Sequence, residues 1–188
     1  MKTVYIFLAE GFEEIEAVTP ADILRRAGCT VKFVSCTNKT SVCGSHAITC
    51  LADELIAHLK ADDPLPDAVV LPGGMPGATN LAACKPLEDL VKRMNEDGRI
   101  VAAICASPAV VLSHFGVLEG KCATCYPGMH VKAPEGSQIS WQNARLVVDG
   151  TIITSAGPGT AGEFGFAIAD ALLGPGASAK VKSGMLYQ

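Results

Sequence analysis

The hydrophobic and polar positions of this chain alternate between short apolar runs and longer amphipathic segments. Residues 3–9, 67–71 and 99–104 are nearly continuous apolar runs of strand length, as expected for strands that are buried on both faces of a sheet. Residues 87–96 carry apolar side chains at helical spacing and charged side chains on the opposite face, and Gly98 follows as a stop signal. Strand and helix signals that alternate in this way predict an α/β fold with a mostly parallel sheet.

The segments between these runs predict further elements. Thr19 before Pro20 is typical of an N-cap, so we expect Pro20 to start or kink the first helix, which Gly28 ends. No linker, internal repeat or low-complexity segment divides the chain, so we expect one domain over residues 1–188. Weaker patterns predict a strand at 30–36, hairpins within 37–52 and 146–154, and helices at 53–59, 106–115 and 160–173.

Composition narrows the classes of function. Hydrophobic residues make up 49% of the chain, which excludes a disordered protein. The formal net charge is −4 and the basic residues are scattered, so the chain lacks the basic patch of a nucleic-acid-binding protein. No apolar run approaches the roughly 18 residues of a membrane span, and residues 3–9 are too short for a secretory signal. We therefore expect a cytoplasmic protein with no membrane or nucleic-acid partner.

In the cytoplasm, cysteines are normally kept as reduced thiols, and we expect the same of the cysteines in this chain. Cys122 and Cys125 have the spacing of a metal or redox pair, but no second pair follows them. Two unlinked thiols near a strand end are therefore the favoured interpretation, and we expect no metal site. The eight cysteines are Cys29, Cys36, Cys43, Cys50, Cys84, Cys105, Cys122 and Cys125.

Cys105 has the most specific local context of the eight. The buried run at 99–104 leads directly into it, and the next helix begins at once, with Pro108 in its first turn. Such a strand–turn–helix elbow places the thiol at the edge of the sheet, beside the unpaired N–H groups of a helix N-terminus. The unpaired N–H groups and the partial positive charge of the helix N-terminus both favour a thiolate, so we expect the pKa of Cys105 to lie below the ordinary value of about 8.5. The alternative is a buried and inert thiol.

Two other strand ends are predicted to meet the same edge, where ligands of open α/β sheets bind. Gly73 and Gly74 would let backbone N–H groups approach a ligand closely. Glu13 and Glu14 have the pattern of a solvated helix start, whereas Glu16 approaches the apolar stripe and is expected to point inward. A carboxyl beside a thiolate has a raised pKa in a partly dry site, so it can donate a hydrogen bond to sulfur and transfer protons.

Four segments resemble one family, in the same order and along nearly the whole chain. They are Glu13-Glu14-Ile15-Glu16, Leu71-Pro72-Gly73-Gly74, Ala102-Ala103-Ile104-Cys105-Ala106 and Thr154-Ser155-Ala156-Gly157-Pro158-Gly159-Thr160. These motifs are similar to those of the DJ-1-like branch of the ThiJ/PfpI superfamily. The resemblance implies a flavodoxin-like three-layer sandwich, with a mostly parallel sheet between helices on both faces, and a homodimer.

The resemblance also implies roles for individual residues. Cys105 would be the nucleophile, Glu16 its partner acid, and the backbone amides of Gly74 and Ala106 the oxyanion donors. Members of this branch are associated with cofactor-independent glyoxalase or deglycase activity, chaperone-like protection and the sensing of oxidative stress. No cofactor is therefore expected, and the partners implied are small carbonyl substrates, such as methylglyoxal and glyoxal, or glycated proteins.

One position departs from the family pattern. The family often has a histidine where this chain has Tyr126, and a tyrosine cannot act as the imidazole of a Cys–His dyad at neutral pH. A protease mechanism therefore loses its base. His130, four residues further on, is a candidate auxiliary residue together with Tyr126 itself.

Two functions stay open at this point. In the first, the Cys105 thiolate attacks an aldehyde and Glu16 transfers protons during the rearrangement that follows. In the second, the protein is a non-catalytic redox sensor or chaperone in which Cys105 is oxidised to sulfinic acid. A class I amidotransferase-like hydrolase fits less well, because no His-x-Glu pair lies near the C-terminus.

Overall fold

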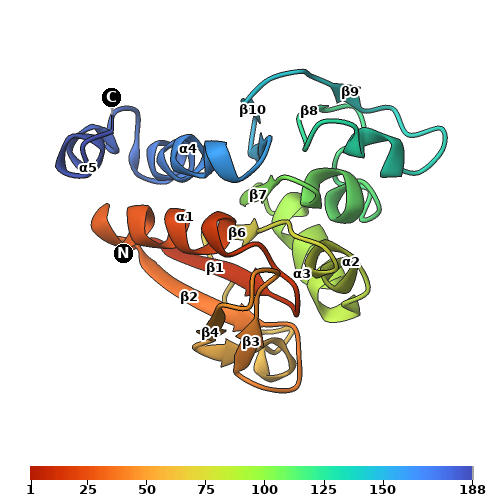
Figure 1. The fold of residues 1–188 in the computed structure, drawn as a ribbon, viewed down its shortest axis with the longest axis horizontal. Coiled ribbons are helices and arrows are strands. Elements are labelled where there is room, and N and C mark those ends of the chain that lie inside the picture. Colours follow the sequence, from red (N-terminus) through yellow and green to blue (C-terminus); the bar gives the residue numbers. More distant parts are fainter. Residues whose placement is uncertain (188) are drawn as a thin grey trace.

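A seven-stranded sheet between two layers of helices organises residues 1–187, the part of the chain that the computed structural model describes (Figure 1). The strands of this sheet are β1 (Thr3–Leu8), β2 (Thr30–Ser35), β5 (Glu54–Leu55), β6 (Ala68–Leu71), β7 (Ile100–Ile104), β10 (Leu146–Asp149) and β11 (Ile152–Ser155). Two small pairs lie outside it, β3 (Ser41–Cys43) with β4 (Thr49–Leu51) and β8 (Cys122–Ala123) with β9 (Ser140–Trp141). The helices are α1 (Glu14–Arg26), α2 (Gly77–Ala82), α3 (Lys85–Glu96), α4 (Ala161–Leu173) and α5 (Ala179–Gly184). Single turns of 3₁₀ helix occur at Ile56–His58, Met129–Lys132 and Pro158–Thr160, and a π-helical turn occurs at Pro108–Leu112.

The three most apolar runs form the centre of the sheet. The strand order is β10-β11-β7-β6-β1-β2-β5, and every neighbouring pair is parallel except β10 with β11. Val4 pairs with Ala68, and Leu71 pairs with Ala103, so β1, β6 and β7 are adjacent and in parallel register. The predicted flavodoxin-like α/β sandwich is confirmed, and the carboxyl ends of these strands share one edge.

Successive side chains of the central strands enter two separate cores, because neighbouring residues of a strand point to opposite faces. On one face, Ile6 and Leu8 of β1 pack with α1 and α4, which lie side by side (Figure 1). On the other face, Phe7 packs with α3 and with the π-helical turn after β7. Each large apolar side chain buried in this way contributes roughly 1.5–3 kcal/mol to folding. No helix within residues 1–187 combines the length and apolar character of a membrane-spanning helix.

The first helix begins at the helix start that Glu13 and Glu14 predicted, and not at Pro20. α1 starts at Glu14, and Glu13 is its N-cap, with Oε2 accepting the backbone N–H of Glu16 at 2.7 Å. Pro20 lies inside the helix rather than at its start, where its missing N–H leaves one helical hydrogen bond unmade. The Glu13 carboxylate supplies the cap in place of Thr19, and Glu14 and Glu16 therefore lie in the first helical turn.

Two other local predictions need correction. Residues 53–59 form β5 and a 3₁₀ turn instead of a short helix, because Asp53 ties this segment to β2. Its backbone N–H donates to Phe33 O at 2.8 Å, and its carboxylate accepts the Phe33 N–H at 2.8 Å. The helix predicted at 106–115 is present only as the π-helical turn and further turns. The hairpins within 37–52 and 146–154 are confirmed as β3–β4 and β10–β11.

Candidate active site

Cys105 occupies a strained turn between β7 and the π-helical turn. Its φ of 64° lies in the left-handed region, which is costly for any residue other than glycine. Neighbouring segments hold the turn in place: the Cys105 N–H donates to Ser155 O at 2.9 Å, and its C=O accepts the Tyr126 N–H at 2.8 Å. Ser107 Oγ donates to Pro72 O at 2.6 Å and so ties the turn to the end of β6. The elbow predicted from the sequence is therefore present.

Glu16 lies against this thiol and has no exposed surface. Its Oε2 accepts the backbone N–H of Gly73 at 2.8 Å, whereas Oε1 has no polar partner at hydrogen-bonding geometry among residues 1–187. Burial raises the pKa of Glu16 to about 7, although the Gly73 N–H and the Cys105 thiol both lower it. Glu16 thus points inward, as the sequence predicts, and a pKa near 7 lets its carboxyl exchange a proton near neutral pH.

The pKa of Cys105 differs from the sequence-based expectation. Burial raises the pKa of the thiol to about 12, and the nearby Glu16 carboxylate adds to the rise, while the N–H groups of Ala106 and Gly74 oppose it. The expected pKa below 8.5 was wrong because the sequence shows the helix start but neither the desolvation nor the partner charge. Coulomb repulsion opposes two charges here, so the pair carries at most one negative charge near neutral pH, and that charge lies on Glu16.

Backbone amides surround the sulfur because two glycines approach it. The N–H groups of Gly74 and Ala106 both hydrogen-bond Cys105, and their role as oxyanion donors stays a prediction. A Cβ at Gly73 would lie 2.8 Å from Cys105 Cβ, 2.8 Å from Glu16 Oε2 and 3.0 Å from Ala106 N. The Gly73 backbone therefore fills the space between nucleophile, carboxylate and amide, and a side chain there would separate them.

Replacing Gly73 with alanine is expected to lower the free energy of unfolding by about 1–3 kcal/mol, the usual cost of an overpacked interior. The cost arises because the neighbours of the new methyl group are backbone and a fixed carboxylate, which cannot move away cheaply. Urea denaturation of the two proteins measures the difference. Gly159→Ala is the matched control, because a Cβ there meets no atom within 4 Å. Equal destabilisation by both variants would contradict this account of Gly73.

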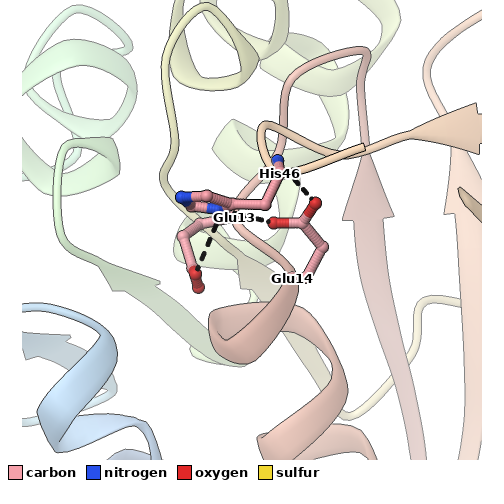
Figure 2. A group of neighbouring side chains, drawn as sticks. All are labelled: Glu13, Glu14 and His46. Carbon is pink, nitrogen blue, oxygen red and sulfur yellow. Dashed lines mark hydrogen bonds and ion pairs between the residues drawn. The ribbon is translucent and has the colours of Figure 1, made fainter. Parts of the chain in front are cut away.

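Glu13 and Glu14 are buried, contrary to the solvated helix start predicted for them. Figure 2 shows both carboxylates turned toward His46, which lies in the loop between β3 and β4. Glu14 Oε2 pairs with His46 Nδ1 at 2.9 Å, and Oε1 accepts the backbone N–H groups of His46 at 2.7 Å and Ile48 at 3.3 Å. Burial favours a raised pKa for Glu14, but these hydrogen bonds lower it below its usual value. Glu14 thus anchors the loop on α1.

The same three side chains are the one group of residues in the described chain whose ligand atoms are near enough to hold a metal ion. One atom from each of Glu13, Glu14 and His46 lies within 4.8 Å of the others. Hydrogen bonds already use both oxygens of Glu14, and Glu13 Oε2 caps α1. The cluster is accounted for as a structural tether, and the expectation of no metal site stays a prediction.

Tyr126 and His130 line a cavity of about 340 Å³ beside the elbow, together with Cys125 and Trp141. The Tyr126 backbone is bonded to Cys105, and its side chain is 49% exposed. Within residues 1–187, no hydrogen bond or ion pair links the imidazole of His130 to Cys105. Both auxiliary candidates therefore line this cavity, and within residues 1–187 neither side chain makes a hydrogen bond to the Cys105 thiol.

The sequence analysis did not single out Cys84, a thiol whose pKa is lowered in the folded chain. A hydrogen bond from the Cys36 thiol lowers the pKa of Cys84 to about 7, even though burial opposes this. One signal was present in the sequence: Cys84 immediately precedes Lys85-Pro86, a typical start of a helix, and is the N-cap of α3. The contact with Cys36 comes from tertiary structure and has no local signal.

Comparison with known proteins identifies a family and several proteins to which this chain is similar. The model of the DJ-1/PfpI family matches residues 2–171. The chain is 43% identical over 173 residues to Protein DJ-1 homolog B of Arabidopsis thaliana, covering 92% of this chain but only 39% of that protein. It is 36% identical over 189 residues to the Parkinson disease protein 7 homolog of Danio rerio, covering 100% and 98% of the two chains. The chain thus spans less than half the length of its Arabidopsis relatives and nearly all of the zebrafish one.

One nematode relative is named for an enzyme activity, and one similar solved structure is described as oxidized. The chain is 34% identical over 166 residues to a Caenorhabditis elegans protein named glutathione-independent glyoxalase DJR-1.2, covering 88% of this chain and 86% of that one. The solved structure described as Toxoplasma gondii DJ-1, oxidized, superposes with a TM-score of 0.92 at 35% identity, covering 100% of this chain and 99% of that chain.

Proposed function

Because the chain belongs to the DJ-1/PfpI family, we propose that it is a cofactor-independent glyoxalase that converts methylglyoxal to lactate and glyoxal to glycolate. The observation that carries this proposal is the partly exposed Cys105 thiol beside the fully buried Glu16 carboxyl, with two backbone amides bonded to the thiol. The nematode relative named a glyoxalase supports the same chemistry. Early glycation adducts of proteins offer a similar carbonyl carbon, so deglycation is the same proposal with a larger substrate.

The first step joins sulfur to the aldehyde carbon. Glu16, with a pKa of about 7, is an effective general base near neutral pH and accepts the proton of the Cys105 thiol as the C–S bond forms. The aldehyde oxygen gains the electron pair of its π bond, and the N–H groups of Gly74 and Ala106 stabilise it. Protonation of this oxygen completes a hemithioacetal, and the Glu16 proton is available for it.

The second step moves one proton along the substrate. The Glu16 carboxylate removes the hydrogen from the carbon bonded to sulfur and delivers a proton to the ketone oxygen, so an enediol forms. The neighbouring carbon then takes a proton while the hydroxyl on the sulfur-bearing carbon loses its own and becomes C=O, which gives a lactoyl thioester of Cys105. Water then cleaves the C–S bond and releases lactate and the thiol. The sum is methylglyoxal plus water giving lactate, so neither an external oxidant nor a reductant is consumed. The unpaired Oε1 of Glu16 is free for this transfer.

Purified protein supplied with methylglyoxal, but no glutathione, is expected to release one lactate for each methylglyoxal consumed. Lactate is measured enzymatically after the protein has been removed. In D₂O the enediol step predicts deuterium at the carbon next to the carboxylate, and mass spectrometry detects it. Consumption of methylglyoxal without lactate would indicate simple adduct formation on surface lysine and arginine side chains, and it would contradict the proposal.

A redox function is the second candidate, favoured by one specific comparison. The Toxoplasma relative is described as oxidized, and Cys105 is partly exposed, so an oxidant can reach it. The amides of Gly74 and Ala106 would then hold the oxygens of a sulfinate. In this case the protein produces no lactate before or after peroxide treatment. A homodimer, a chaperone role and a cytoplasmic location stay predictions.

A further inference from the structure

The cavity of about 340 Å³ beside the Cys105 turn is bounded by segments that are hydrogen-bonded to residue 105 itself. The N–H of Tyr126, which lines the cavity, donates to the Cys105 C=O at 2.8 Å. Ala156, a second lining residue, directly follows Ser155, whose C=O accepts the Cys105 N–H at 2.9 Å. The wall of the cavity is thus joined, directly or through one peptide, to the residue that carries the thiol.

The other side of the Cys105 turn, where β6 ends, is filled. A Cβ at Gly73 would lie 2.8 Å from Cys105 Cβ and 2.8 Å from Glu16 Oε2. A Cβ at Gly74 would lie 2.5 Å from the backbone nitrogen of Glu13. Even one added carbon therefore has no room between these segments, so a substituent of a substrate that is bonded to the Cys105 sulfur has to leave the site by another side.

The lining of the cavity suits an uncharged aromatic ring. Trp141 and Tyr126 provide aromatic faces and Pro127 an apolar one, and of the described residues that line the cavity none is Lys, Arg, Asp or Glu. The Trp141 segment is fixed, because Trp141 pairs with Ala123 of β8 in the small β8–β9 sheet. An apolar cavity of roughly 150 Å³ already holds a benzene ring, so this larger cavity has room for one. Aromatic walls favour such a ring through stacked and edge-to-face contacts.

We propose that this cavity binds an aryl substituent on the ketone carbon of a 2-oxoaldehyde, with Trp141 and Tyr126 as specificity-determining residues. The inference rests on the proposed function, because Cys105 and Glu16 perform the same reaction on the aldehyde group. With phenylglyoxal, the C–S bond forms at the aldehyde carbon, one proton moves from that carbon to the neighbouring carbon, and water cleaves the resulting thioester. The sum is phenylglyoxal plus water giving mandelate, so neither an oxidant nor a reductant is consumed.

A larger cavity, of about 600 Å³, is less suited to this group. It is lined by residues of α1, α4 and α5, among them the charged side chains of Arg145, Asp170 and Lys182. None of the described residues that line it hydrogen-bonds Cys105. The smaller cavity is therefore the one that a substituent of a Cys105-bound substrate would enter.

Trp141→Ala is expected to lower the ratio of kcat/KM for phenylglyoxal to kcat/KM for methylglyoxal by at least about tenfold, because it removes one wall of the cavity. Mandelate and lactate formation are measured, since loss of phenylglyoxal also reports its reaction with arginine side chains. Trp141→Phe keeps an aromatic wall and should hold the ratio within about threefold of the wild type. The control is Val131→Ala, at a residue that is 70% exposed and does not line the cavity. An unchanged ratio in Trp141→Ala would overturn the proposal.

A binding measurement tests the cavity without turnover. Trp141 is the only tryptophan of the chain, so the tryptophan fluorescence of the wild-type protein reports on this cavity alone. Mandelate should change the emission in a saturable way, whereas lactate at the same concentration should not, and Tyr126→Ala should weaken mandelate binding about 3- to 10-fold. No response to mandelate would overturn the proposal even in a protein that converts methylglyoxal to lactate. A response to mandelate in a protein that forms no lactate would instead contradict the glyoxalase proposal.

Discussion

Cys105→Ser is expected to reduce lactate formation from methylglyoxal by at least about 10³-fold, because a hydroxyl in place of the thiol is a far weaker nucleophile near neutral pH. The replacement keeps the approximate size of the side chain, and residue 105 bonds its neighbours in the turn through its own main-chain N–H and C=O. The fold should therefore survive, and a thermal melt within a few degrees of the wild type checks this. Steady-state lactate production is the measurement.

Cys122→Ser is the matched control for this substitution. Cys122 is exposed on β8 and is not part of the Cys105 site, so the same chemical change there should leave turnover within twofold of the wild type. If Cys105→Ser retained wild-type turnover, the glyoxalase proposal would lose its nucleophile. Methylglyoxal loss in that protein would then be assigned to lysine and arginine side chains.

Glu16→Gln is expected to lower turnover by about 10²–10⁴-fold, the usual range for loss of a general acid–base group. Glutamine keeps an oxygen that can accept the Gly73 N–H and an amide that can donate to the Cys105 sulfur. It cannot accept the thiol proton or move a proton between the substrate carbons. The loss should therefore appear in kcat, with KM changed much less. A loss confined to KM would show that Glu16 only shapes the site.

The same substitution should make the protein more stable at alkaline pH. Burial raises the folded-state pKa of Glu16 from 4.5 to about 7. Below about pH 4.5 the carboxyl is neutral in both states, but as pH rises toward 7 the unfolded chain ionises first and becomes favoured. The shift of about 2.5 units corresponds to about 3 kcal/mol at roughly 1.4 kcal/mol per unit. Glu16→Gln should thus gain about 3 kcal/mol over the wild type between pH 4.5 and pH 8.

Urea denaturation of both proteins at several pH values measures this difference. If the difference in free energy of unfolding between the wild type and Glu16→Gln stayed constant across the pH range, the Glu16 carboxyl would ionise alike in the folded and unfolded chains, which would contradict the prediction. Glu54→Gln is a useful reference, because Glu54 is a partly exposed carboxylate whose hydrogen bond with His58 lowers its pKa. Its pH dependence should therefore have the opposite sign to that of Glu16.

The centre of the fold could be predicted because its signal is local. Each of β1, β6 and β7 is an apolar run of strand length, and burial on both faces is what makes parallel central strands apolar. The Cys105 elbow was predictable for the same reason, since strand, cysteine and helix start are consecutive in the sequence. Pattern and structure agree wherever neighbouring residues alone decide the conformation.

The missed features all depend on segments that meet only in the folded chain. Glu14 appeared to be a solvent-facing carboxylate, because its partners at His46 and Ile48 lie in a distant loop. The influence of Cys36 on the pKa of Cys84 also joins residues that are far apart in the sequence. The Cys105 pKa depends on how deeply Glu16 and the thiol are buried together, and no local pattern reports the degree of desolvation.

The arrangement of the sheet bears on how the protein avoids aggregation. Its most apolar strands, β6 and β7, lie in the interior of the sheet, where neighbours use their backbone N–H and C=O groups on both sides. The two edges are β5, only two residues long, and β10, which packs against β8. Long, flat, apolar edge strands are the places where a second chain adds to a sheet. The folded protein therefore exposes little edge on which amyloid-like strands could add. The segments AVVL of β6 and IVAAI of β7 can pair with another chain only when the sheet opens.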